Sequence, residues 1–124
     1  MTTPYTARVY VPPINKRNRI PQAAIDDVKR QIVEKFKPNK IILFGSYAYG
    51  KPKRESDVDM LVIMNTRLKE SQQEIRILRS IDYHFGLDLL VKTPASLKKR
   101  LRLGDVFLKE VVQKGKVIYE RPAR

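Results

Sequence analysis

The sequence predicts a single basic globular domain in which helices and strands are interleaved. Its 124 residues are close to the commonest domain size. That length leaves room for one hydrophobic core, but not for a catalytic domain together with a separate substrate-recognition domain. Two patterns indicate the mixed class: apolar residues recur at three- and four-residue steps in some segments, and short β-branched runs occur in others.

The first half is expected to form one helix and two buried strands. In residues 21–36 the apolar side chains lie on one stripe of a helix, and Pro38 stops that helix soon after its end. Residues 40–44 are a short β-branched and aromatic run, and residues 57–64 are a second apolar run with acidic residues at its start. Both runs are typical of buried strands.

The second half adds a helix, a strand and two further helices. A polar helix over residues 65–85, ended by Gly86, is expected to precede a third strand over residues 87–91. Pro94 then opens a strongly basic helix, and a last helix runs to Gly115.

We expect three parts along the chain. Residues 1–20 carry three prolines and four basic residues without a helical period, and are predicted to form an extended basic arm. Residues 21–120 form the domain, which residues 116–120 close with a small strand, and residues 121–124 form a C-terminal tail.

The composition restricts the chemistry. The chain has no cysteine and one histidine, which excludes disulfides, thiolate zinc sites, cysteine nucleophiles and a multi-histidine metal site within one chain. Catalysis must therefore use carboxylates, hydroxyls or bound cofactors. The net charge of +13 would attract nucleic acid, nucleoside triphosphates or an acidic protein surface, or serve solubility alone.

The hydrophobic segments are short. No apolar run approaches the roughly 20 residues that cross a bilayer, and the first ten residues contain no continuous apolar segment of the signal-peptide type. We therefore expect neither membrane insertion nor secretion, and hence a cytoplasmic protein.

A candidate ligand site lies between the first two strands. A glycine that leaves a buried strand lets the backbone approach a ligand, and Ser46 adds an amide and a hydroxyl, so Gly45 and Ser46 are suited to phosphate oxygens. In an extended strand Asp57 and Asp59 project from one face about 7 Å apart. Both carboxylates can then converge on a hard cation such as magnesium.

A third acid extends this site. Asp88 lies between two leucines of the third strand, and it completes a carboxylate trio if that strand neighbours the second. Three acids in a small core repel one another unless metal ions neutralise them. Two magnesium ions about 4 Å apart are the usual arrangement for phosphoryl or nucleotidyl transfer.

These residues resemble the minimal nucleotidyltransferases (MNT) of the DNA polymerase β superfamily. The resemblance covers about residues 20–120 in element order as well as in motif. It implies an α/β (α+β) fold with a small mixed sheet flanked by helices. The motif consists of Gly45-Ser46, a ten-residue gap, Asp57-x-Asp59 and Asp88.

The resemblance also implies a role for each residue. Gly45 and Ser46 would hold the triphosphate of a nucleotide, while Asp57 and Asp59 would bind two magnesium ions. Asp88 would hold one of these ions and help to deprotonate the incoming hydroxyl.

The chain departs from the family pattern at one position. Many relatives carry arginine where Tyr49 stands, so one phosphate-facing cation is absent there. Lys51, Lys53 or Arg54 could replace it, or each could be a solvated loop charge.

The function implied by the resemblance is transfer of a nucleoside monophosphate, AMP from ATP, onto a hydroxyl. Small proteins of this kind are commonly antitoxins paired with HEPN-type RNase toxins, and are thought to adenylylate a tyrosine of the toxin. A hetero-oligomer with such a toxin is therefore expected. The alternatives are RNA as the acceptor, for example a tRNA 3′ end, and a non-catalytic basic binding module.

Other polar and aromatic residues receive structural interpretations. Ser56 is expected to shape the loop by a local hydrogen bond, and His84 to interact with a helix C-terminus. Tyr47 and Tyr49 could stack a nucleobase or pack against neighbouring side chains. A basic cluster on the helix after Pro94 is either solvated or a surface for RNA or an acidic partner; it comprises Lys98, Lys99, Arg100 and Arg102.

Overall fold

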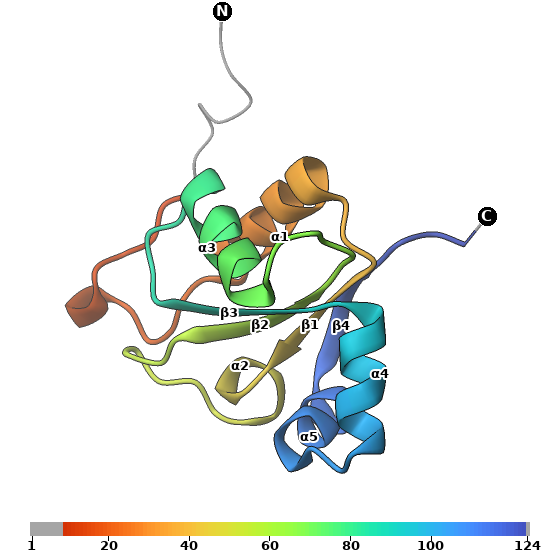
Figure 1. Ribbon diagram of the computed structural model, residues 1–124. Helices are drawn as coiled ribbons and strands as arrows, with labels where there is room; N and C mark the ends of the chain where they lie inside the picture. Colours follow the sequence, from red (N-terminus) through yellow and green to blue (C-terminus); the bar gives the residue numbers. More distant parts are fainter. Residues whose placement is uncertain (1–8, 124) are drawn as a thin grey trace, which may run out of the picture.

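A four-stranded mixed sheet in the order β3-β2-β1-β4 organises the chain (Figure 1). The structure is a computed structural model that describes residues 9–123. The strands are β1 (Lys40–Phe44), β2 (Val58–Ile63), β3 (Leu87–Lys92) and β4 (Lys116–Glu120). β1 pairs antiparallel with both β2 and β4, whereas β2 pairs parallel with β3. The predicted mixed sheet and α/β class are therefore confirmed.

Helices cover both faces of the sheet (Figure 1). One face packs against α1 (Gln22–Phe36) and α3 (Glu70–Ser80), and the other against α4 (Pro94–Arg102) and α5 (Val106–Lys114). Alternation along β2 sends Val58, Met60 and Val62 to the first face and Leu61 and Ile63 to the second. Because both faces are covered at the centre of the sheet, β1 and β2 are almost continuously apolar.

The helix ends follow from local chemistry. Lys37 adopts a left-handed conformation (φ 49°) after α1, and its N–H donates to the Val33 carbonyl. The Thr93 hydroxyl accepts the Ser96 N–H at 3.1 Å at the start of α4. One short helix was not predicted: α2 (Ser46–Tyr49) occupies a single turn after Gly45.

The helix predicted over residues 65–85 is shorter than expected. It spans 70–80, because the buried Gln31 amide of α1 exchanges two hydrogen bonds of 2.8 Å with the backbone of Asp82. These bonds hold the chain after Ile81 in a non-helical conformation. His84 therefore does not lie in the last turn of this helix, which ends four residues earlier.

The described part of the predicted N-terminal arm contacts the domain. Ile20 is fully buried, and its N–H donates to the Tyr47 hydroxyl at 2.9 Å. Arg17 donates to the carbonyl of Arg54 at 3.1 Å, and a 3₁₀ turn spans residues 14–16. The arm is thus attached to the domain over residues 9–20, while residues 1–8 lie outside the described part. Among the described residues, no helix has the length and apolar character to span a bilayer.

Candidate active site

Two aspartates face each other on neighbouring strands at one end of the sheet. Phe44, Asp59 and Asp88 are register partners across β1, β2 and β3. Strand alternation places both carboxylates on the sheet face that α5 covers. The expectation that the third strand neighbours the second is confirmed.

The Asp59 carboxyl has a raised pKa. Its partial burial, its hydrogen bond with Asp88 and the negative charges of Asp88 and Asp57 raise its pKa to about 6. Two ionised carboxylates held this close repel each other until a proton or a cation intervenes. The site therefore favours binding of positive charge.

Asp57 lies just before β2 and packs over a glycine. A Cβ atom built on Gly86 would meet the Asp57 Oδ1 at 1.9 Å, so only glycine leaves space for this carboxylate. The Val58 N–H donates to the Gly86 carbonyl at 2.9 Å, which fixes the two chain segments together. Sequence reasoning treated Gly86 only as a helix terminator. The signal in the sequence that could have revealed this role is that Gly86 directly precedes a strand that carries an acidic residue.

Gly45 bears the same relation to Asp59. It has a φ of +72°, and a Cβ atom there would lie 2.2 Å from the Asp59 Oδ2. The backbone at Gly45 thus comes close to a carboxylate of the chain itself, and its predicted approach to a phosphate stays a prediction. Ser46 follows as the first residue of α2.

A cavity of about 460 Å³ opens beside these carboxylates. Its volume lies within the range of small-molecule sites. The lining residues are Phe44, Gly45, Tyr49, Asp59, Asp88, Leu89, Leu90 and Phe107, and none of these described residues is basic. A bound polyphosphate would therefore need its charge balanced by metal ions or by side chains outside this lining.

Two exposed aromatic residues contribute to the apolar lining of the cavity. Tyr49 is 41% exposed and donates to the Glu110 carboxylate at 3.3 Å, and Phe107 is 51% exposed. Phe107 stacks edge to face on Phe44 with a centroid distance of 5.7 Å. Sequence analysis gave Phe107 no role beyond its place in the last helix, because helical spacing does not separate a core residue from a cavity wall.

The remaining predicted residues divide into structural and exposed groups. The Ser56 hydroxyl accepts the Lys53 N–H at 2.9 Å, which confirms its role in shaping the loop. Tyr47 is 7% exposed and lies under the Arg19 guanidinium, so it packs in the domain. His84 and the basic cluster of α4 are exposed.

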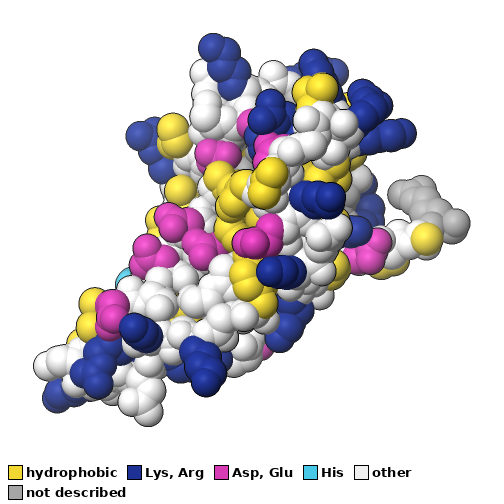
Figure 2. Space-filling model, turned by 90° about the horizontal axis from the view of Figure 1, so that it is seen from below, with side chains coloured by type: hydrophobic (Ala, Val, Ile, Leu, Met, Phe, Trp, Pro, Cys, Tyr) yellow, Lys and Arg dark blue, Asp and Glu magenta, His cyan; other side chains and the backbone are white. Residues whose placement is uncertain are grey.

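The carboxylates supply suitable ligands for a hard divalent cation. Within residues 9–123, no three His, Cys, Asp or Glu side chains are grouped so that they could hold one metal ion together. Asp59 and Asp88 are nonetheless in contact, and carboxylate oxygens are the preferred ligands of magnesium. Figure 2 shows that acidic side chains gather in one region of the face seen from below, with Lys and Arg side chains mostly around its edge.

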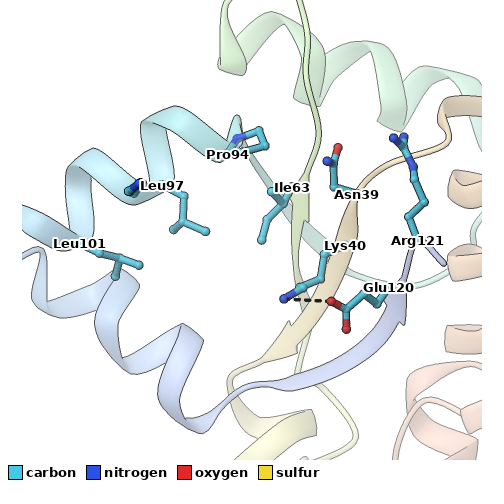
Figure 3. Close-up of a pocket in the computed structure, with 9 residues that line it drawn as sticks. Asn39, Lys40, Ile63, Pro94, Leu97, Leu101, Glu120 and Arg121 are labelled. Atoms are coloured by element: carbon cyan, nitrogen blue, oxygen red, sulfur yellow. Dashed lines mark ion pairs between the residues drawn. The ribbon is translucent and has the colours of Figure 1, made fainter. Parts of the chain in front are cut away.

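A second cavity, of about 490 Å³, lies at the other end of the strands between α4 and the sheet (Figure 3). Pro94, Leu97, Leu101 and Ile63 supply its apolar wall. On its rim the Lys40 ammonium lies 3.7 Å from the Glu120 carboxylate. It includes none of the predicted site residues, so we place the chemistry in the smaller cavity.

A family match gives the class of protein to which the chain belongs. The sequence matches the family "Polymerase beta, Nucleotidyltransferase" over residues 26–124. The chain therefore belongs to this family. It is also 37% identical over 95 residues to a protein of Methanocaldococcus jannaschii named "Putative protein adenylyltransferase MJ0141", an alignment that covers 73% of this chain and 91% of that relative.

Solved structures share the fold at lower identity. A "toxin-antitoxin with AMP-PNP" contains a chain that is 23% identical, with a TM-score of 0.53 and coverage of 77% of this chain and 73% of that one. A nucleotidyltransferase structure from Sulfolobus solfataricus is 18% identical, with a TM-score of 0.51 and coverage of 82% and 90%. These likenesses concern the fold alone.

Proposed function

We propose that the protein is a magnesium-dependent adenylyltransferase that moves AMP from ATP to a hydroxyl group of a partner protein. The observation that carries the proposal is the contact of Asp59 with Asp88 beside Gly45, in a cavity without basic lining residues. Such a site attracts cations, and cations in turn attract a triphosphate.

Each site residue then has a defined task. Gly45 and Ser46 hold the triphosphate, because the glycine allows close approach and the serine offers an amide and a hydroxyl. Asp57, Asp59 and Asp88 are the proposed magnesium ligands. When bound, two magnesium ions neutralise charge at the transferred phosphorus and activate the attacking hydroxyl.

The transfer is an in-line displacement. The acceptor oxygen forms a bond to the α-phosphorus, the bond from that phosphorus to the bridging oxygen breaks, and pyrophosphate leaves with the electron pair. Asp88 accepts the hydroxyl proton as the new bond forms. Asp59 lies beside Asp88 as its register partner on the neighbouring strand, so both carboxylates face the same ligand.

A protein acceptor is supported by the relative at 37% identity, whose name describes a protein adenylyltransferase. We propose a HEPN-type toxin as this acceptor, with the chain acting as its antitoxin in a hetero-oligomer. One of the solved structures that share the fold is a toxin-antitoxin, which is compatible with this pairing. The net charge of +13 favours RNA as the second candidate acceptor.

The experiment that tests the proposal is transfer of α-phosphate label from ATP into a lysate of the source cell with magnesium. The wild-type protein is compared with two variants. One is the double variant Asp57→Ala, Asp59→Ala, and the other is the control Asp26→Ala, which changes an exposed acid of α1. Label that the double variant loses and the control variant keeps is assigned to this site.

The nature of the acceptor is read by digesting the labelled products. Label that resists ribonuclease and is released by protease identifies a protein acceptor, as proposed. Label that ribonuclease removes would instead establish RNA modification. If no label is transferred, and magnesium with ATP does not raise the thermal midpoint of the purified chain, the hypothesis of a non-catalytic binding module would replace that of an enzyme.

A further inference from the structure

Three large apolar side chains are exposed together at the turn between α4 and α5. Leu103 is 65% exposed, Val106 80% and Phe107 51%. We call these three residues the turn patch. An apolar side chain gains free energy when it leaves water, so a group of them at the surface is typical of a contact site for another molecule.

The turn that presents this patch is well fixed. The Arg100 guanidinium pairs with the Asp105 carboxylate at 3.0 Å, and Asp105 also accepts the Leu108 N–H at 3.0 Å as the cap of α5. Gly104 supplies a positive φ of 85° between the helices. The patch is therefore presented in one geometry, which reduces the ordering cost of binding.

The patch is continuous with the active-site cavity. Phe107 belongs to both, because it lines the cavity together with Asp59 and Asp88. A molecule seated on Leu103 and Val106 would thus reach the mouth of the cavity. This is the place that an acceptor hydroxyl must approach.

The two helices that meet at the patch are mostly basic. Their exposed charged side chains are Lys98, Lys99, Arg100, Arg102, Lys109 and Lys114, with Glu110 as the exposed acid. A second copy of the chain is a poor occupant, because two chains of charge +13 repel each other. The complementary partner has acidic side chains around an apolar centre.

We infer that the turn patch is the docking surface for the acceptor protein, which contacts it with apolar side chains inside an acidic rim. The inference rests on the proposed adenylylation of a protein, and it adds where that protein binds. Leu103 and Val106 anchor the acceptor, and the basic residues of α4 steer its approach. Labelling of RNA in place of a protein is one of the outcomes that the test distinguishes.

The test compares Val106→Asp with Ile75→Asp. Val106 is the first residue of α5, where a carboxylate suits the helix N-terminus, so the substitution should leave the fold intact. Ile75 is 50% exposed on α3, which covers the opposite face of the sheet, and provides a matched control. Far-ultraviolet circular dichroism and thermal midpoints establish that both variants fold.

The readout is steady-state adenylylation of the protein that wild type labels, purified after its identification by mass spectrometry. Val106→Asp should raise the KM for this acceptor roughly tenfold, since one central apolar anchor carries more than 1 kcal/mol. It should leave kcat and the KM for ATP unchanged, and Ile75→Asp should match wild type. Leu103→Asp is the second variant and should reproduce the effect.

Each contrary result overturns the inference in a recognisable way. Wild-type KM values in both patch variants would show that the acceptor docks elsewhere. An equal rise in Ile75→Asp would show a nonspecific effect of added charge. If wild type labels RNA and no protein, the proposed function fails first, and the docking surface fails with it.

Discussion

The Asp59 carboxylate lies against the α-carbon of Gly45, so closely that a methyl group on this glycine would be 2.2 Å from Oδ2. The backbone that follows β1 and the acid of β2 therefore form one structural unit. A ligand bound by Asp59 would lie next to the Gly45 segment. This relation places the proposed metal ligands beside the proposed triphosphate site.

Replacement of Gly45 by alanine should abolish activity. The new methyl group displaces the Asp59 carboxylate, and the positive φ adds a conformational cost of about 1–2 kcal/mol. We expect at least a 100-fold loss of AMP transfer, because displacement of a reacting group by about 1 Å can cost this much. Initial rates with labelled ATP measure the effect.

Gly104→Ala is the matched control for this substitution. Gly104 also has a positive φ, but no atom lies within 4 Å of the position of its Cβ. Gly104→Ala should lose stability in urea denaturation through backbone strain alone, whereas Gly45→Ala should lose more because it also has the Asp59 contact. Only Gly45→Ala should lose the rise in thermal midpoint that magnesium and ATP produce. Equal loss of that rise in both variants would show that backbone strain, and not contact with Asp59, explains the requirement for glycine.

Gly86→Ala should impair catalysis through Asp57. The methyl group would overlap the Asp57 carboxylate, whose Oδ1 lies 1.9 Å from the Cβ position. We expect a roughly tenfold or greater fall in kcat, while the apolar core is unchanged. A kcat equal to that of wild type in this variant would show that catalysis does not depend on where the Asp57 carboxylate lies in the structure.

Asp59→Asn should stabilise the metal-free protein at high pH. The pKa of Asp59 is raised to about 6 in the folded protein, above its unfolded value near 3.8. The protein therefore binds more protons folded than unfolded, and stability falls as pH rises through about 6. Thermal midpoints should be higher for the variant than for wild type at pH 8 and equal at pH 4.

Magnesium should reverse this difference. At pH 8 it should raise the midpoint of wild type and have little effect on Asp59→Asn, because a bound cation offsets the repulsion between the carboxylates. The matched control is Asp26→Asn, which should respond to magnesium as wild type does. A pH-independent difference between wild type and Asp59→Asn would contradict the carboxylate coupling.

Glu70→Gln should weaken the edge of the sheet at neutral pH. Burial acts to raise the pKa of Glu70, but the Thr93 N–H at 2.9 Å and the Lys92 ammonium at 3.2 Å outweigh it and lower the pKa. Its stabilisation is therefore present above the unfolded pKa and is lost as pH falls through the folded one. Urea denaturation at pH 7 should show a loss of about 1 kcal/mol.

Glu34→Gln provides the comparison for Glu70. Glu34 is exposed on α1 and pairs with Arg30 at 3.4 Å, and such surface pairs contribute little. Its stability should stay within about 0.5 kcal/mol of wild type. An equal loss in both variants would indicate a general charge effect.

The sequence predicts the strands well because their apolar runs are bounded by glycine and aspartate. β1 spans 40–44 as expected, and β2 and β3 differ by one residue at their ends. The end of α3 could not be predicted, since it depends on hydrogen bonds between Gln31 and Asp82, which lie 51 residues apart. Local patterns do not report such contacts.

For the site, the spacing of the carboxylates in the sequence predicted that they lie together. The residues that pack around them could not be predicted. Alternation along two strands sufficed to bring Asp59 and Asp88 together once the strands paired. The contribution of Gly86 and Phe107 depends on which segment packs against which, and this is a property of the folded chain. The metal ligands and the nucleotide contacts stay predictions.

The most direct measurement is to compare α- and γ-phosphate-labelled ATP with the identified acceptor, using wild type, Asp59→Asn, Asp88→Asn and Asp26→Asn. Nucleotidyl transfer at the Asp59–Asp88 pair predicts that the acceptor gains label from the α-phosphate only. The two site variants should lose at least 100-fold in rate, and Asp26→Asn should match wild type. Label from the γ-phosphate, or full transfer by Asp59→Asn, would contradict the site proposed for this protein.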